Sequence, residues 1–185
     1  MGFFPFYFYN KNVHPMLTDL YFSSDVISQI KIDVVASSAG IRNILINKNS
    51  EALADMKEIN PDNSLVVHVF KQLSEYFKRE RKAFDLRLEI IGTEFQKKVW
   101  KELLNIPYGK TITYNQLAIN LGDKKVIRAA GAANGANPLP IVIPCHRVIG
   151  SDGNLVGYGG GLEVKQKLLE LEGSWSLDMF RKEKN

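Results

Sequence analysis

The segment IPCHRVIG, from Ile143 to Gly150, contains the only cysteine of the chain, Cys145, followed by a histidine and an arginine. A cysteine is nucleophilic as a thiolate, so it needs a base or a positive charge close by. His146 and Arg147 are the neighbours in sequence that supply these. Adjacent side chains in extended backbone point apart, so His146 can couple to Cys145 only if the chain turns here or through a water molecule. The segment predicts a thiol that ionises with help from an imidazole.

Two questions about this segment stay open at the level of residues. An imidazole base works best when a third group orients its far nitrogen, and spacing along the chain does not identify that group. An unpaired cysteine is also commonly just a small buried hydrophobic residue. The apolar run Ile141–Ile143 predicts a buried strand that Pro144 ends. That strand would hold Cys145 rigidly at its end, facing a cleft.

The composition of the 185 residues bounds the surroundings of this thiol. Hydrophobic residues make up 45% and charged residues 24% of the chain, as in a soluble globular protein with a real core. One cysteine excludes an internal disulfide framework and any zinc site built on several cysteines, and it suits a reducing compartment. The remaining histidines are His14 and His68. His68 falls within a predicted helix, where we expect a packed or partly exposed side chain rather than a ligand.

The aromatic opening of the chain resembles neither a signal peptide nor a membrane span. It lacks a basic start, has Pro5 inside its apolar run and is too short to cross a bilayer. We expect residues 1–19 to be an extension or an edge strand packed on the body.

The formal charge of +4 is unevenly distributed. Residues 1–91 hold 11 Lys and Arg and 11 Asp and Glu, whereas residues 92–185 hold 13 and 9. An excess confined to the second half fits a polyanionic partner there, and it fits an ordinary solvated surface as well.

The first half predicts a small α+β domain that ends near residue 91. Alternating apolar residues predict two strands around the turn SSAG at residues 37–40. Residues 64–80 have apolar side chains near one face and predict a helix. Residues 84–91 predict a further strand or an extended connector.

The second half begins with a helix signature. Thr93 and Gln96 have the spacing of a capping box, in which a hydroxyl and an amide satisfy two free N–H groups. An apolar face follows, and Pro107 and Gly109 end the helix.

A helix-turn-helix is predicted next. Thr113 and Gln116 repeat the capping-box spacing, Gly122 ends the first helix, and Asp123 caps a second helix that runs to about Ala133. After Arg128 the second helix consists almost entirely of small residues, which let a backbone come very close to a neighbour. That neighbour is either another helix or a groove of nucleic acid, and the residues alone leave both open.

A glycine-rich loop, GYGGG at residues 157–161, leads into a last helix that Gly173 ends. Such loops often hold phosphates, but this one matches no phosphate-loop pattern. Glycines can equally let a ligand lie against the backbone.

Together these motifs resemble the O6-alkylguanine-DNA alkyltransferases, also called methylated-DNA–protein-cysteine methyltransferases. The resemblance runs from Gly92 to Gly173 and includes, in family order and spacing, GTEFQKKVW, IPYGKTITYNQLA, IRAAGAANGANPLPIVIPCHRVIG and GYGGGLEVKQKLLELEG. PCHRV is highly specific, whereas the first half resembles the family's N-terminal domain only weakly. The resemblance implies an α+β fold: a small sheet-plus-helix domain, then a mostly helical domain with a helix-turn-helix and a short active-site strand. We expect an extension over 1–19 and domains over 20–91 and 92–185.

The resemblance also implies a chemistry. Cys145 would attack the alkyl carbon of O6-alkylguanine in duplex DNA, with guanine as leaving group. His146, acting through water, would take the thiol proton, and Glu172 would orient His146. The product is a thioether, a poor leaving group, so each molecule acts once. No metal or organic cofactor is implied.

The same resemblance implies how DNA is held. The second helix would enter the minor groove with its small residues, including Ala129 and Gly131, and the damaged guanine would flip into a pocket. Arg128 would fill the vacated place in the stack. Tyr114 would crowd the target phosphate and then donate its hydroxyl to a ring nitrogen of guanine.

A further group of residues would form the pocket. Asn137 would hold the turn between recognition helix and active-site strand. The carbonyls of Cys145 and Val148 would read the exocyclic amine of guanine. The amide of Gly159 would bond O6, and Tyr158 is expected among the pocket residues. Many relatives carry a side chain at position 159, and glycine keeps the amide donor.

Other expectations concern partners and rival functions. We expect a monomer that binds DNA, uses no membrane, and lies in the cytoplasm, or in the nucleus of a eukaryote. The N-terminal zinc site of some relatives should be absent, because no cysteine lies there. The rivals are a non-catalytic binder of alkylated bases, which would lack the reactive cysteine, and a helix-turn-helix regulator, which would need long polar side chains on its recognition helix. A cysteine hydrolase is a third, made awkward by the adjacent Cys and His.

Overall fold

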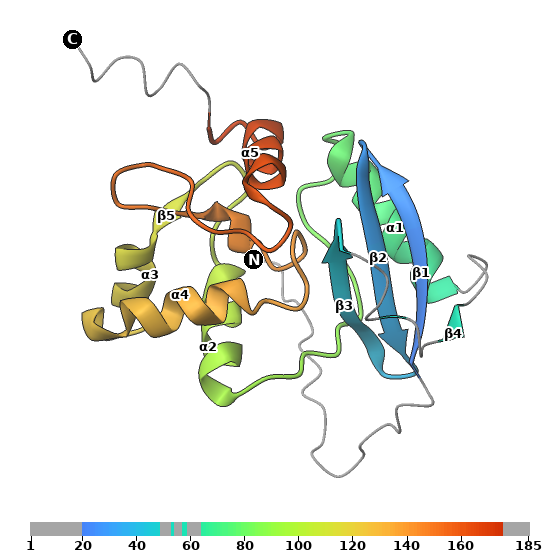
Figure 1. Cartoon of the computed structure of the whole chain (residues 1–185), viewed down its shortest axis with the longest axis horizontal. Coiled ribbons are helices and arrows are strands. Elements are labelled where there is room, and N and C mark those ends of the chain that lie inside the picture. Colours follow the sequence, from blue (N-terminus) through green and yellow to red (C-terminus); the bar gives the residue numbers. More distant parts are fainter. Residues whose placement is uncertain (1–19, 49–52, 54–56, 59–63, 176–185) are drawn as a thin grey trace. The chain divides into compact units, whose positions relative to one another are not determined.

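The computed structural model describes residues 20–48, 53, 57–58 and 64–175 (Figure 1). The chain divides into two compact units, residues 1–91 and residues 92–185. The expected extension over residues 1–19 lies outside the described residues. Within the described ranges, no helix is long and apolar enough to cross a membrane.

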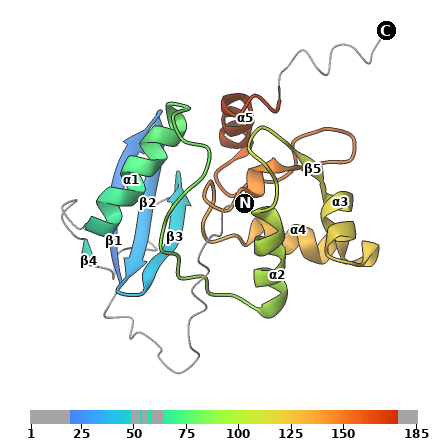
Figure 2. The same cartoon turned by 180° about the vertical axis from the view of Figure 1, so that it is seen from behind.

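The first unit is a sheet with one helix. In chain order its strands are β1 (Tyr21–Ile27), β2 (Ile30–Ser37), β3 (Gly40–Ile46) and β4 (Lys57–Glu58). The order in the sheet is β3-β2-β1-β4, with β1–β2 and β2–β3 antiparallel and β4 parallel to β1. Helix α1 (Ser64–Phe77) lies across one face of the sheet (Figures 1 and 2). The predicted pair of strands around residues 37–40 and the predicted helix are confirmed.

Burial in this unit includes the apolar positions and, in β2, polar ones as well. Every residue of β2 except Lys31 is buried. The inner face of α1 is fully buried and consists of Val66, Val69, Leu73 and Tyr76. Residues 84–91 form an extended connector, in which Leu88 makes an isolated bridge with Ile41 beside β3.

Helix α2 (Glu94–Leu103) opens the second unit where the capping box predicts. The Thr93 hydroxyl accepts from the N–H of Gln96 (3.2 Å), and the Gln96 side chain accepts from the N–H of Thr93 (2.8 Å). The buried Trp100 donates from Nε1 to the carbonyl of Ala133 (2.8 Å). That bond ties α2 to the second helix of the helix-turn-helix.

The helix-turn-helix consists of α3 (Tyr114–Asn120) and α4 (Ile127–Gly135). Gly122 has φ +98° and ends α3, as predicted. Asp123 caps the short 3-10 helix η3 (Lys124–Val126), because its carboxylate accepts from an N–H only two residues on (2.8 Å). This short-range cap tightens the first turn. The single helix predicted from Asp123 to about Ala133 is therefore found as η3 followed by α4, which begins at Ile127 and ends at Gly135.

Residues 141–143 do not form the predicted strand. They are buried, but they lie in a turn in which Ile141 has φ +74° and Ile143 makes only an isolated bridge with Pro140. Asn137 satisfies this turn: its Nδ2 donates to the carbonyl of Ile143 (2.8 Å) and its Oδ1 accepts from the N–H of Leu139 (3.0 Å). The apolar run indicated burial correctly, but a side chain supplies the hydrogen bonds that a neighbouring strand would give.

The remaining elements surround the cysteine. The 3-10 helix η4 (Cys145–Arg147) follows the turn, and β6 (Val148–Ile149) comes after it, paired in parallel with β5 (Ile112–Thr113). The short strand is therefore found after the cysteine rather than before it. The last helix, α5 (Leu162–Leu171), ends in a turn at residue 173, where the predicted glycine has φ +72°.

Candidate active site

Cys145 is the first residue of η4 and is almost fully buried, with 5% of its surface exposed. The chain turns here, which is the condition for the neighbouring cysteine and histidine to act together. Burial raises the pKa of the thiol to about 11, although Asn137, the charge of Lys165 and nearby backbone N–H groups lower it in part. Burial outweighs these favourable neighbours, so loss of the thiol proton requires a base, which is the part expected of His146. The thiol keeps its proton.

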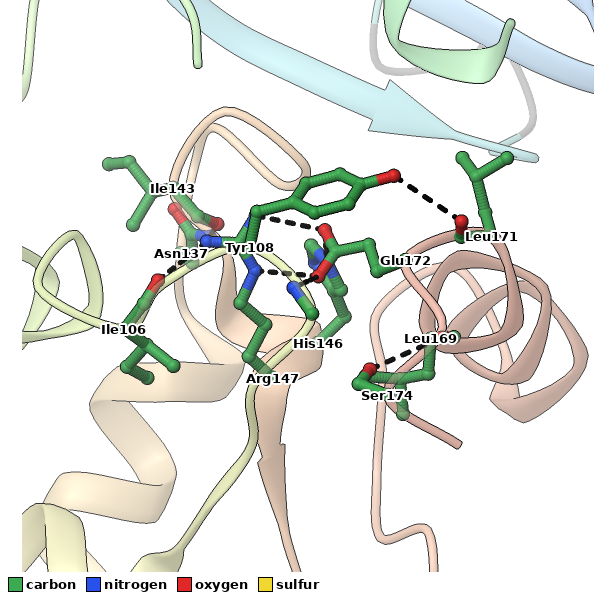
Figure 3. A network of polar contacts seen from close by, with 11 residues as sticks. Ile106, Tyr108, Asn137, Ile143, His146, Arg147, Leu169, Leu171, Glu172 and Ser174 are labelled. Atoms are coloured by element: carbon green, nitrogen blue, oxygen red, sulfur yellow. Dashed lines mark hydrogen bonds and ion pairs between the residues drawn. The ribbon is translucent and has the colours of Figure 1, made fainter. Parts of the chain in front are cut away.

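His146 is the base available to that thiol. Its ring is fully buried, and Nε2 lies 2.9 Å from Oε1 of Glu172 (Figure 3). Burial lowers the pKa of His146 more than the carboxylate raises it, so the ring is neutral. With Nε2–H donated to Glu172, the lone pair of the neutral ring lies on Nδ1. Nδ1 is buried and has no hydrogen-bond partner among the described residues.

Glu172 is the third group that spacing could not identify. Arg147 donates to both of its oxygens (2.9 Å each), and the N–H of Gly109 donates to Oε2 (3.2 Å) (Figure 3). Burial raises the pKa of Glu172, but the hydrogen bonds from His146 and Arg147 outweigh it and lower the pKa to about 2. Glu172 is thus a fixed anion, and the charge of Arg147 serves the carboxylate rather than the thiol.

The surroundings of Arg147 fix this anion in place. Its Nη1 donates to the carbonyl of Ile106 (2.6 Å), and its guanidinium lies over the ring of Tyr108 at 5.8 Å. The Tyr108 hydroxyl donates to the carbonyl of Leu171 (3.3 Å) (Figure 3). The turn after α2 is thereby joined to the end of α5, next to Glu172.

Lys165 is a residue that sequence reasoning missed. It is fully buried, and its Nζ donates to the carbonyls of Val148 and Val156 (2.7 Å each). Burial lowers its pKa to about 8, and its charge helps to lower the pKa of Cys145. The available signal was its position on the buried face of α5, three and four residues before Leu168 and Leu169.

Tyr114 and Asn134 link the helix-turn-helix to the cysteine. Burial raises the pKa of Tyr114, so its hydroxyl keeps its proton. The amide Nδ2 of Asn134, on α4, lies 3.4 Å from the Tyr114 hydroxyl and 3.4 Å from the carbonyl of Cys145. Sequence reasoning did not single out Asn134, although it is a polar residue on the buried side of a helix of small residues.

The exposed residues of α4 are Ile127 and Arg128 in its first turn and otherwise only small side chains. Arg128 and Ala129 are exposed, and Gly131 is half-buried, where a Cβ would meet the Tyr114 ring at 3.7 Å. The exposed positions of α4 are Ile127, Arg128, Ala129, Ala132 and Gly135, and the exposed Ala136 follows the helix. The helix is therefore packed against the unit through its inward small residues, while its outward small residues are exposed.

The other predicted pocket residues lie around the cysteine turn and the glycine loop. Asn137 holds the turn before Cys145, as described above, and Val148 is fully buried in β6. Tyr158 has a buried hydroxyl without a hydrogen-bond partner among the described residues, and burial raises its pKa well above the ordinary value. Gly159 is exposed, with open space where a Cβ would lie. Among the described residues, no three potential ligand side chains gather to hold a metal ion.

A cysteine, a neutral histidine and a carboxylate arranged in this way are the components of nucleophilic, covalent chemistry. Here they lie in the same unit as a helix-turn-helix, which defines the class: a nucleic-acid-binding protein with a reactive thiol. The profile described as "6-O-methylguanine DNA methyltransferase, DNA binding domain" matches residues 94–174, and the profile for the "ribonuclease-like domain" of the same family matches residues 31–90. The chain belongs to the 6-O-methylguanine DNA methyltransferase family.

Individual relatives agree with this assignment. A methylated-DNA–protein-cysteine methyltransferase of Methanosarcina acetivorans is 55% identical over 104 residues, 56% of this chain and 67% of the relative. One from Mycobacterium tuberculosis is 50% identical over 114 residues, 62% of this chain and 69% of the relative. The crystal structure of the M. tuberculosis O6-methylguanine methyltransferase has a TM-score of 0.76 at 35% identity, covering 87% of this chain and 99% of that one. The structure of M. tuberculosis OGT in complex with DNA has a TM-score of 0.72 at 37% identity, covering 84% and 92%.

Proposed function

We propose that this protein repairs alkylated DNA by transferring the alkyl group from O6 of guanine to Sγ of Cys145. The bond between carbon and sulfur forms as the bond between carbon and O6 breaks. The thiol loses its proton, and the departing guanine takes up one proton. The observation that carries the proposal is the buried turn that joins Cys145 to a neutral His146, whose Nδ1 is unpartnered among the described residues and whose Nε2 is held by Glu172.

Removal of the thiol proton is the first task of this site. With a pKa of about 11, Cys145 is almost entirely protonated at pH 7. The free Nδ1 of His146 accepts that proton, and a water between Sγ and Nδ1 conducts it. The imidazolium formed is stabilised at Nε2 by the Glu172 carboxylate, which stays ionised at any pH above about 2.

DNA is held by the helix-turn-helix, with α4 in the minor groove. Beyond Ile127 and Arg128 in its first turn, the exposed face of α4 offers only small side chains to the groove floor. Arg128 takes the place of the guanine that flips out of the stack, and Ala129 with Gly131 lets the backbone come close. Tyr114, at the start of α3, crowds the target phosphate and then donates its hydroxyl to a ring nitrogen of the flipped base.

The pocket reads guanine through backbone groups. The carbonyls of Cys145 and Val148 accept from the exocyclic amine. The hydrogen bond that Lys165 already donates to the Val148 carbonyl orients this carbonyl. The Gly159 amide bonds O6 as negative charge develops there, and Tyr158 lines the pocket. We also propose that the protein acts as a monomer in the compartment that holds the chromosome.

Each chain acts once, because sulfur holds the alkyl group as a thioether that has no leaving group and no route to hydrolysis. A non-catalytic binder of alkylated bases would need neither a nucleophile nor a base, and Cys145 with its histidine therefore favours transfer.

The test measures the removal of the methyl group from the DNA base. A duplex oligonucleotide with one O6-methylguanine is incubated with a molar excess of protein, digested to nucleosides and analysed. We expect the modified nucleoside to be converted to deoxyguanosine. Cys145→Ser should be inactive, and Ser151→Ala, at an exposed position, should be fully active as the matched control. Persistence of the modified nucleoside in the presence of folded wild-type protein would overturn the proposal.

A further inference from the structure

Asn134 is a buried polar residue that the mechanism above does not use. It lies on α4 with 4% of its surface exposed. Its Nδ2 lies at 3.4 Å from two oxygens, the Tyr114 hydroxyl and the Cys145 carbonyl, while its Oδ1 has no partner among the described residues. Only a nitrogen can lie beside the Cys145 carbonyl without repulsion, which fixes the orientation of the amide.

This amide determines what Tyr114 and Cys145 can offer to a ligand. A phenol that accepts from an N–H keeps its own proton for donation elsewhere, and a carbonyl that accepts one hydrogen bond keeps a second lone pair. Burial keeps the Tyr114 hydroxyl protonated. A hydrogen-bond donor and a hydrogen-bond acceptor therefore each lie 3.4 Å from one shared nitrogen of Asn134.

One edge of guanine is the complement of such a pair. Its minor-groove edge presents a ring nitrogen, which accepts, next to an exocyclic amine, which donates. A purine without the amine offers only the acceptor. Two contacts of 3.4 Å are long for N–H···O hydrogen bonds, so both oxygens keep capacity for an incoming base.

We propose that Asn134 is a positioning residue that sets the Tyr114 hydroxyl and the Cys145 carbonyl at the spacing of guanine's minor-groove edge. This inference rests on the proposed function. It assigns to α4 a second task beyond the groove: its outward face meets DNA, while Asn134 on its inward face aligns the groups that recognise the flipped base. Asn134 touches neither the base nor the sulfur and acts through its two neighbours.

The experiment compares three bases in one duplex context: O6-methylguanine, O6-methylhypoxanthine, which lacks the amine, and an O6-methylguanine analogue with C–H in place of the ring nitrogen at the minor-groove edge. Transfer rate constants are measured for wild type, Asn134→Leu, which keeps side-chain volume, and Asn134→Ser, which relieves crowding. Asn120→Leu is the matched control, because Asn120 is an exposed asparagine on α3 that bonds to Glu102. The preference for one base over another within one preparation does not depend on the fraction of folded protein.

We expect both variants to lose about fivefold of the preference for O6-methylguanine over each analogue, the equivalent of one net hydrogen bond. We also expect Asn134→Leu to have little further effect when it is combined with Tyr114→Phe and tested on the analogue with C–H in place of the ring nitrogen. The hydroxyl that Asn134 positions is already absent in that background. Asn120→Leu should keep the wild-type preference.

Equal slowing on all three bases would mean that Asn134 is only structural and would overturn this inference alone. Unchanged rates and preferences in both variants would overturn it as well. Absence of transfer by wild type from any of the bases is a different outcome, because it would overturn the proposed function and this inference together.

Discussion

At the scale of single residues, the site is governed by where two protons lie. Burial raises the pKa of Cys145 to about 11, so sulfur is protonated at pH 7, and burial lowers the pKa of His146, so the ring is neutral. A protonated nucleophile beside an unprotonated base is the ground state that general base catalysis requires. The reaction then depends on a proton transfer whose acceptor is Nδ1 of His146.

The first prediction concerns this transfer. His146→Gln keeps an amide N–H that can donate to Glu172 but removes the base. We expect alkyl transfer at pH 7 to slow by about 10²–10⁴-fold, with the deficit shrinking as pH rises, because hydroxide replaces the imidazole as the thiol is titrated toward its pKa. The measurement is the single-turnover rate between pH 6.5 and 9.5. His68→Gln, on α1 of the first unit, is the matched control and should behave as wild type. A deficit that is the same at every pH would contradict the assigned base.

The second prediction concerns Glu172 and acid stability. Its pKa in the folded protein is about 2, below the ordinary value for glutamate. A carboxylate with a lowered pKa stabilises the fold fully above the unfolded value, and this stabilisation is lost as pH falls through the folded value. We expect Glu172→Gln to lower the free energy of unfolding by about 3 kcal/mol at pH 7, and the difference from wild type to narrow between pH 5 and pH 2.

Urea unfolding at a series of pH values measures this difference. The control is Glu94→Gln, which removes an exposed carboxylate paired with Lys97 on α2 and should change stability little. If the difference between wild type and Glu172→Gln were independent of pH, the carboxylate would not hold its partners through its charge.

At the scale of elements, two turns and one helix face decide how the site is presented. The helix α4 is buried through Ala130, Ala133 and Asn134 and open through its small outward residues. We expect Ala129→Leu to leave stability unchanged, because the position is exposed, and to weaken binding to duplex DNA by about tenfold or more, because the added bulk prevents close approach. Fluorescence anisotropy with a labelled duplex measures binding, and thermal unfolding measures stability.

The control for that helix face is Ala83→Leu, at an alanine of the first unit that is also exposed. It should change neither quantity. Wild-type affinity in Ala129→Leu would show that this face of α4 does not enter a groove.

The two glycine turns make a matched pair. Gly109 has φ +73°, donates to Glu172, and would bring a Cβ to 2.9 Å from the Glu172 carbonyl oxygen. Gly159 has no left-handed φ and open space at its Cβ position. We expect Gly109→Ala to cost about 1–3 kcal/mol of stability and Gly159→Ala to stay within about 0.5 kcal/mol. Denaturant unfolding of both variants is the measurement, and equal costs would contradict the described backbone.

At the scale of the whole molecule, periodicity and capping signals predicted most of the elements. Thr93 with Gln96 marked the start of α2, Gly122 marked the end of α3, and alternating apolar residues marked β2 and β3, because these signals act within a few residues of the chain. The α+β class and the methyltransferase family were predicted on the same motifs and are confirmed.

The rest depended on contacts between distant parts of the chain. The apolar run at residues 141–143 indicated burial but not the turn, because Asn137 satisfies its backbone from outside the run. A local pattern also could not show that Lys165 would be enclosed against two carbonyls, or that Asn134 would reach both Tyr114 and the cysteine turn. The raised pKa of the Cys145 thiol could not be predicted for the same reason, since the burial that causes it is a property of the assembled unit.

The central claim is that Cys145 keeps the alkyl group it removes. After incubation with an excess of duplex DNA containing O6-methylguanine, we predict by intact mass that each chain gains one methyl group and no more, however long the reaction runs. Peptide mapping should locate that group on Cys145, and Cys145→Ala should gain nothing. Folded wild-type protein that stays at its original mass, or that carries the methyl group on another residue, would contradict the account.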